Sequence, residues 1–227
     1  MHQPTTSNNA IVPYITTRVG ERLGVGMNLR IHPTRGLCYA PEFANDRDSS
    51  GALWARRSHN PRDNAGQPTG EPLYAKVHPS RQRECMYELR CQICCREPAS
   101  RTSLGYLFLL EQPDDGMRAG WPEGELTRHP PLCLPHAKVS VKRCPPLRRG
   151  HVAVRVKMPR LYGIKGLPFT THWDAEQDDV PDDNDADIVS YRDPRIRWYL
   201  ATQLVRRLCG VTVIDLTAER AAAELGR

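Results

Sequence analysis

The chain has 227 residues, which suits one compact domain with appended segments, and only 39% of them are hydrophobic, which limits the core. Its 20 prolines and 16 glycines predict a loop-rich fold. No apolar run is long enough to cross a bilayer, and the first residues lack a basic stretch followed by an apolar one. We therefore exclude a membrane-spanning helix and expect a cytoplasmic protein, in which eight cysteines favour metal ligands or core residues over disulfides.

The first third of the chain predicts short strands separated by loops. Residues 1–10 are polar, and we expect them to be disordered. Residues 58–71 consist almost entirely of turn formers and predict a long loop. Four stretches with apolar, β-branched or aromatic residues predict strands: 11–19, 36–40, 51–56 and 72–77.

Two helices are predicted in the middle of the chain. Residues 78–90 predict a helix with Ser80 as its N-cap, which would lead directly to Cys91. Residues 132–144 predict a shorter helix that begins near Cys133 and ends at the two prolines that follow it.

The remaining middle segments predict strands and loops. Residues 104–110 predict a strand, and a second long loop is expected at 111–131. Residues 151–157 alternate Val with His, Arg and Lys, which is the clearest period-two strand pattern in the chain. Residues 174–187 contain eight acidic residues and no basic one, and they predict an acidic linker or insert.

The strongest helix pattern lies near the C-terminus, at residues 193–210. Asp193 fits the N-cap and Pro194 the first helical position. An apolar stripe with a spacing of four residues supports the helix: Ile196, Leu200, Leu204 and Leu208. A short strand at 211–216 and a terminal helix at 217–227 complete the prediction.

Two pairs of residues have the spacing of metal ligands. Cys91 and Cys94 are separated by two residues, and Cys133 and His136 repeat this spacing 42 residues later. Zn²⁺ is bound by four thiolates or imidazoles in a tetrahedron, and two ligands separated by two residues fit one tight turn. The two pairs together predict a zinc site; the alternatives are buried free thiols and a redox pair, which the helix before Cys91 disfavours.

The order of turn, hairpin and helix around these ligands resembles a treble-clef zinc module. The resemblance implies that Cys91 and Cys94 lie in a knuckle, and that Cys133 and His136 lie in the first turn of a helix. Many knuckles have glycine after the second cysteine, where this chain has Cys95. A ligand position could therefore be shifted to Cys95, or the fourth ligand could be Cys144 instead of His136.

Four protein ligands leave no open position on the metal, so a structural rather than catalytic zinc is expected. The chain contains neither the H-E-x-x-H motif nor the H-x-E motif of zinc deaminases. Nucleases of the His-Asn-His type, which also use treble-clef-like scaffolds, remain an alternative. They would need a catalytic histidine before the ligand helix, and His129 lies in a proline-flanked loop.

A basic stretch follows the zinc ligands. The formal net charge is +6, and residues 126–173 contain no acidic residue. Such a stretch favours binding of DNA or RNA through their phosphates, although solvated surface charge explains it equally simply. Seven residues are the candidate contacts: Lys138, Lys142, Arg143, Arg148, Arg149, Arg155 and Lys157. A zinc-stabilised scaffold that binds a protein partner is the equally weighted alternative.

Together these patterns predict a loop-rich α+β fold, with short strands and a few helices around a treble-clef-like zinc site. Four parts are expected: a disordered 1–10, a zinc-containing domain at 11–173, the acidic linker, and a helical segment at 188–227 packed on the domain. Phrases such as VHPSRQRECMYELRCQIC and HPPLCLPHAKVSVKRCP resemble a group of uncharacterised actinobacterial proteins over residues 36–216. That resemblance implies no activity.

Overall fold

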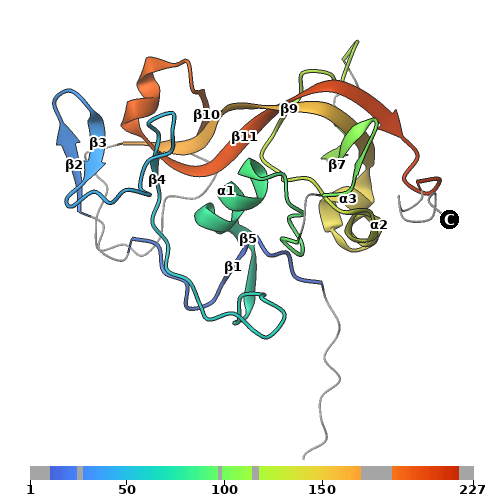
Figure 1. The fold of residues 1–227 in the computed structure, drawn as a ribbon, viewed down its shortest axis with the longest axis horizontal. Coiled ribbons are helices and arrows are strands. Elements are labelled where there is room, and N and C mark those ends of the chain that lie inside the picture. The colour runs from blue at the N-terminus through green and yellow to red at the C-terminus, as the bar shows by residue number, and fades with distance from the viewer. Residues whose placement is uncertain (1–10, 25–27, 97–98, 114–117, 170–185, 220–227) are drawn as a thin grey trace, which may run out of the picture.

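Two long antiparallel strands form the centre of the fold: β9 (His151–Pro168) and β11 (Tyr199–Ile214). They pair from Tyr199 opposite Pro168 to Ile214 opposite Ala153, with two irregularities in register. The computed structural model describes residues 11–24, 28–96, 99–113, 118–169 and 186–219. The two strands cross the molecule as one curved ribbon (Figure 1), and the Val-rich alternation predicted at 151–157 begins the first of them.

Shorter strands extend this ribbon into a mixed sheet of seven strands. Its main order is β4-β11-β9-β7-β6, while β10 also pairs with β9 and β8 with β11. Among the described strands of this sheet, only β4 and β11 pair in parallel. The added strands are β4 (Leu53–Trp54), β6 (Arg101–Thr102), β7 (Gly105–Glu111), β8 (Leu126–Thr127) and β10 (Asp187–Ser190). The strand expected at 104–110 is thus confirmed as β7, and the loop expected at 111–131 contains β8.

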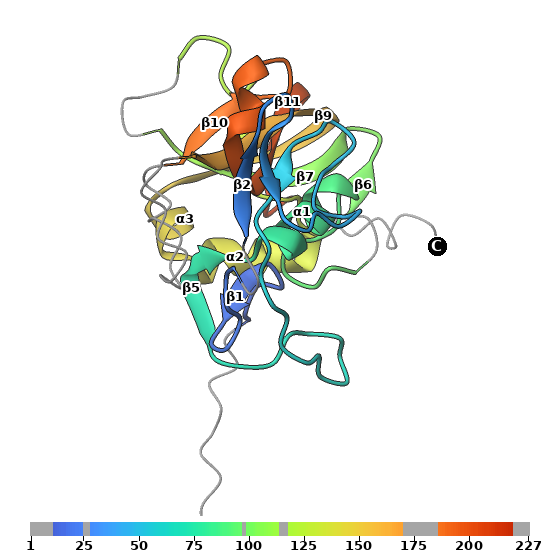
Figure 2. The same ribbon diagram turned by 90° about the vertical axis from the view of Figure 1, so that its left-hand side faces the viewer.

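Two small sheets lie apart from this one. They pair β1 (Thr16–Arg18) with β5 (Pro72–Val77), and β2 (Leu29–His32) with β3 (Gly36–Tyr39). The strands expected at 36–40 and 72–77 are confirmed, whereas that at 11–19 is reduced to three residues and that at 51–56 to the two residues of β4. Figure 2 shows the order from the ribbon at the top, through the helices, to β1 and β5 at the bottom.

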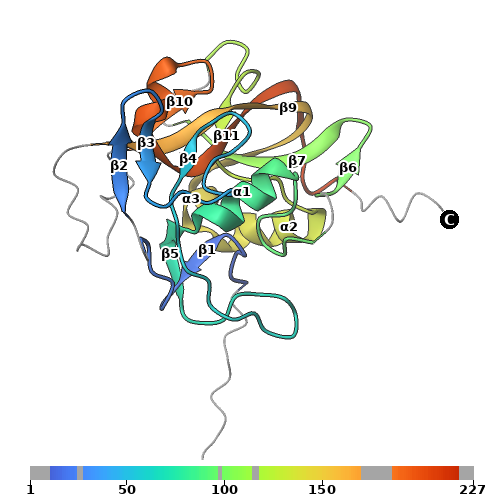
Figure 3. The same ribbon diagram turned by 60° about the vertical axis from the view of Figure 1, so that its left-hand side comes forward.

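Helices cover one side of the ribbon. They are α1 (Pro79–Tyr87), α2 (Leu134–Arg143) and α3 (Pro145–Arg149), and all three lie below β9 and β11 in Figures 1 and 3. The helices expected at 78–90 and 132–144 are confirmed. The expected cap is wrong, because His78 is the N-cap residue of α1 and Ser80 lies inside the helix, after Pro79.

The helix expected at 193–210 is wrong. Asp193 does cap a helix, accepting a hydrogen bond from the Arg195 backbone N–H, but this is the five-residue 3-10 helix η2 (Pro194–Trp198). From Tyr199 onward the chain is strand β11. Residues four apart share one face of a strand as well as of a helix, so the leucine stripe fits both structures. Val205 and Ala201 are buried as well, as expected of a strand covered on both faces.

This correction changes the expected domain organisation. The C-terminal segment is not a helical appendage, because β10 and β11 belong to the same sheet as β7 and β9. The expected disordered N-terminus, most of the acidic linker at 174–187, and the end of the chain lie outside the described residues. Within the described ranges, no helix is long and apolar enough to cross a membrane.

Side chains of the sheet and of α1 fix this helix on β11. The Gln82 amide donates to the Leu204 carbonyl (2.9 Å) and accepts from the Leu204 N–H (2.8 Å), as a neighbouring strand would. The buried Arg206 guanidinium donates to the carbonyls of Met86 (2.8 Å) and Tyr87 (2.9 Å), which end α1. Four residues after α1 ends, the chain reaches Cys91, so these contacts also position the first cysteine pair.

Candidate metal centre

The turn after α1 brings Cys91 and Cys94 together. The Cys95 N–H donates to the Cys91 carbonyl (2.8 Å) and closes the turn. Cys95 itself has φ 51°, a left-handed conformation that favours glycine. Glycine is common at this position in knuckles because it adopts this conformation without a steric clash. Cys95 adopts the same conformation, but its Cβ makes the conformation less favourable.

The hairpin of β6 and β7 connects this turn to α2. The Leu132 N–H donates to Leu107 in β7 (2.9 Å), and the Gln92 N–H donates to the Pro131 carbonyl (3.1 Å). Cys133 is the N-cap residue of α2, and His136 lies in its first turn. The described chain therefore has the order of knuckle, hairpin and ligand helix that the treble-clef resemblance implies.

The four predicted ligands form one cluster. The sulfurs of Cys91, Cys94 and Cys133 and a ring nitrogen of His136 all lie within 4.8 Å of one another. His136 Nδ1 is 2.9 Å from the Cys133 sulfur and 3.6 Å from the Cys91 sulfur. Tetrahedral zinc would separate a sulfur from a nitrogen ligand by about 3.5 Å, given Zn–S near 2.3 Å and Zn–N near 2.0 Å. The donor set fits a four-coordinate metal ion, which would hold the His136 nitrogen and the Cys133 sulfur farther apart than 2.9 Å.

The sulfurs influence one another strongly. Hydrogen bonds from Cys133 and Cys91 hold the pKa of Cys94 far below its usual range. Contacts with Cys133 and Cys94, together with burial, raise the pKa of Cys91 well above its usual range. The cluster thus favours the thiolate form of Cys94 and the protonated form of Cys91. A divalent cation would stabilise the thiolate form of all three cysteines.

The two spare cysteines lie away from the cluster. The Cys95 sulfur is 3.4 Å from a Glu84 carboxylate oxygen and packs against the core of Tyr14, Ile15 and Cys85. Cys144 is the C-cap residue of α2, at the opposite end of a ten-residue helix about 15 Å long. Neither sulfur is part of the four-residue cluster.

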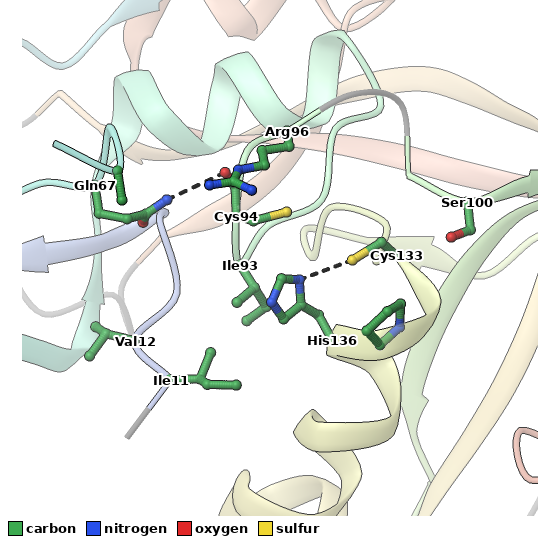
Figure 4. Close-up of a pocket in the computed structure, with 11 residues that line it drawn as sticks. Ile11, Val12, Gln67, Ile93, Cys94, Arg96, Ser100, Cys133 and His136 are labelled. Carbon is green, nitrogen blue, oxygen red and sulfur yellow. Dashed lines mark hydrogen bonds between the residues drawn. The ribbon is translucent and has the colours of Figure 1, made fainter. Parts of the chain in front are cut away.

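One side of the cluster is open to a cavity of about 560 Å³. Cys94, Cys133 and His136 line it, whereas Cys91 is fully buried on the other side. Figure 4 shows the His136 ring between Ile93 and the Cys133 sulfur. The Gln67 amide donates to the Cys94 carbonyl (3.3 Å) and joins the loop at 58–71 to this cavity wall.

A second group of possible ligands, which the sequence did not reveal, consists of Glu21, His59 and His78. The Glu21 carboxylate accepts two bonds from the Arg81 guanidinium (2.5 and 2.7 Å), one from the Arg18 N–H (2.7 Å) and one from a further backbone N–H. These four donors occupy the roughly four lone-pair positions of a carboxylate. Glu21 is therefore a buried ion-pair partner, and nothing remains on it to bind a metal.

Burial and the neighbouring charges also shift the pKa values of Glu21 and His78 in this second group. Burial raises the pKa of Glu21, but the Arg81 guanidinium and the Arg18 N–H outweigh it and lower the pKa to about 2. Burial, assisted by the Arg81 charge, lowers the pKa of His78 to about 3. His78 is therefore neutral near pH 7, and its Nε2 lies 3.1 Å from the Ser58 carbonyl.

The predicted nucleic-acid contacts do not share one face. Arg155 is buried and ion-paired with Glu219 (2.5 Å), and the Lys138 ammonium donates to the Glu219 carbonyl (2.8 Å). The prediction that Arg155 lies on an exposed basic face is therefore wrong: Lys157 is exposed two residues further along β9, but Arg155 is covered by Glu219 and by the carbonyls of Ser100 and Gly105, to which its guanidinium donates. Five of the seven predicted contacts are exposed: Lys142 and Arg143 on α2, Arg148 and Arg149 on α3, and Lys157 on β9.

Comparison of the chain with protein-family models, curated proteins and solved structures finds no match. The resemblance to a treble-clef module thus depends on the order of elements and the ligand positions alone, and the wider resemblance over residues 36–216 remains a prediction. The nuclease alternative gains nothing from the geometry, since His129 lies beyond the end of β8 and outside the ligand cluster.

Proposed function

We propose that this chain is a non-catalytic, zinc-stabilised nucleic-acid-binding protein. The positions of side chains along helix α2 support this proposal. Two ligands of the metal cluster lie at its N-terminus, and exposed basic residues lie at its C-terminus and on α3. A metal ion bound at one end would thus fix the orientation of the basic surface at the other.

The donor set favours zinc. Three thiolates and one imidazole are ligands that select zinc among the common biological cations, and four of them make a closed structural site. Zinc would contribute to stability by joining the knuckle to α2, since neither segment is long enough to be rigid alone.

The proposed contact surface, here called the basic corner, consists of Lys142, Arg143, Arg148 and Arg149. All four are exposed, and no acidic residue occurs between residues 126 and 173. Closely spaced cations displace the counterions that surround a nucleic acid, and this release favours binding. No aromatic residue lies within α3, so phosphates rather than bases are the expected contacts.

The test is binding of labelled DNA and RNA, measured by fluorescence anisotropy between about 50 and 200 mM salt. Changing Lys142, Arg148 and Arg149 together to alanine should weaken binding and reduce the salt slope by about 3. The matched control changes Arg22, Arg30 and Arg118, which are exposed and distant in sequence, to alanine with the same loss of charge.

An equal loss of nucleic-acid affinity in both triple variants would show that only the net charge of the protein matters. It would contradict the proposal that the basic corner is the contact surface. No binding by the unchanged protein even at low salt would favour the alternative, a protein-binding scaffold. One feature supports that alternative: Val19 and Tyr74 of the β1–β5 region are large apolar residues exposed by 51% and 62%.

A further inference from the structure

His136 borders the cavity beside the cluster. Its Nδ1 faces the sulfurs of Cys133 and Cys91, and among the described residues no protein group forms a hydrogen bond with its second ring nitrogen. A metal-binding histidine usually donates this second N–H to a carboxylate, a carbonyl or water, which fixes the ring. The Cys133 sulfur, by contrast, belongs to the residue that caps α2, and Cys91 is buried in the core.

The cavity beside the cluster gives a small molecule access to this position. Its volume of about 560 Å³ is in the range of small-ligand sites. Three ligand side chains line it, and the apolar residues Ile11, Ile93 and Pro135 complete much of its wall. In Figure 4 the His136 ring lies between the cluster and the apolar side chains of Ile11 and Ile93. A molecule in the cavity could therefore contact His136 directly, together with Cys94 and Cys133.

The charges around the cavity indicate which groups such a molecule should carry. Three thiolates and a neutral imidazole around Zn²⁺ carry one net negative charge, and a fourth thiolate would add another. Arg96 lines the same cavity and is exposed. Its guanidinium can accept a second anionic group of the ligand, because planar forks bind carboxylates well.

We propose that the cavity binds a small thiol that also carries a carboxylate, and that its sulfur replaces His136 on the metal. This inference depends on the zinc site of the proposed function. The bond from the metal to His136 Nδ1 breaks, a bond from the metal to the ligand sulfur forms, and the thiol proton is released to solvent. No electrons are transferred, so no oxidant or reductant is required.

The test uses the full chain loaded with Co²⁺ in place of zinc, kept without oxygen, and titrated with 3-mercaptopropionate. Visible bands of tetrahedral cobalt should appear first and then shift, in a saturable manner, from the pattern of three sulfurs and one nitrogen to that of four sulfurs. The metal should remain with the protein on gel filtration. The variant His136→Cys should show the four-sulfur spectrum from the start and should not respond to the thiol.

A second comparison tests Arg96. The variant Arg96→Ala should bind 3-mercaptopropionate about threefold more weakly, as expected of an exposed ion pair, and should bind neutral 2-mercaptoethanol unchanged. The matched variant Arg101→Ala removes an exposed arginine of β6 and should leave both affinities unchanged.

The outcomes separate the two proposals. Failure to form any tetrahedral cobalt spectrum would overturn the metal site itself. Normal bands that do not change with thiol, an equal response of His136→Cys, or loss of the metal into solution would overturn thiol binding and leave the metal site intact.

Discussion

Cys95 has a left-handed backbone conformation, and its sulfur faces Glu84 rather than the cluster of four candidate ligands. The sequence predicts that Cys91 and Cys94 lie together with Cys133 and His136, because a spacing of two residues fits one turn around an ion, and the structure brings these four residues together. The place of Cys95 could not be predicted, since it depends on Tyr14 and Ile15, eighty residues earlier in the chain. The ion pair of Glu21 with Arg81 could not be predicted either, because the two residues are sixty positions apart in the chain and only the fold brings them together.

Substitution of cysteines should distinguish the ligands from the spare thiols. Cys91→Ser and Cys133→Ser should lower zinc affinity and the melting temperature, because each removes one thiolate from a four-ligand site. Cys144→Ser and Cys95→Ala should retain about one zinc per chain, measured by elemental analysis after purification under reducing conditions. Full metal content in Cys133→Ser, or its loss in Cys144→Ser, would show that the assigned ligand set is wrong.

Acid should destabilise the protein in two steps set by Glu21 and His78. Both have a folded-state pKa below the ordinary value, so the unfolded chain binds protons first and stability falls as pH falls. For His78 the loss begins near pH 6.5 and continues toward 3; for Glu21 it begins near 4.5 and continues toward 2.

Urea unfolding between pH 7 and 3 measures this dependence. The Glu21 step corresponds to about 3 kcal/mol in full, since one pKa unit is about 1.4 kcal/mol. Glu21→Gln should be less stable at pH 7 and should lose the steeper decline below pH 4.5. A variant with the same decline as the unchanged protein would assign that step to other groups, including the thiolates of the metal cluster.

At the level of elements, the sequence predicted α1, α2, β7 and the start of β9, because each has one dominant periodicity or a clear terminator. The error at β11 has a simple physical cause. Leu200, Leu204 and Leu208 are all buried, and a spacing of four residues is compatible with both helix and strand. Only the long pairing with β9 decides between them, and that pairing joins residues far apart in the chain.

The contact between α1 and β11 should make a large contribution to stability. Gln82→Leu keeps the volume but leaves the Leu204 N–H and carbonyl without partners in the core, which should cost about 2–4 kcal/mol in the free energy of unfolding. Ser80→Ala is the matched control on the same helix. It should change stability by less than about 0.5 kcal/mol, because Ser80 is exposed and does not cap α1. A large effect of Ser80→Ala would contradict His78 as the N-cap residue.

For the whole molecule, the position of β11 is the central feature. It lies between β4 and β9 in the sheet and contacts α1 from one side, so the end of the chain completes a core begun by residues before 110. Composition and local pattern predicted the α+β class and the loop-rich character. They did not predict that one sheet unites both sides of the acidic stretch.

This arrangement leads us to expect that two fragments of the chain can assemble into the folded protein, because β11 pairs with β9 and β4 of the preceding part. Asp187 pairs with Gly166, so the sheet holds the described residues on both sides of 170–185 next to each other. Cleavage at an inserted protease site within 174–185 should leave two fragments that remain together on gel filtration and regain their circular dichroism after joint refolding, because β11 completes the first fragment by strand pairing. Fragments that separate without denaturant would show that chain continuity, rather than complementation by β11, maintains the fold.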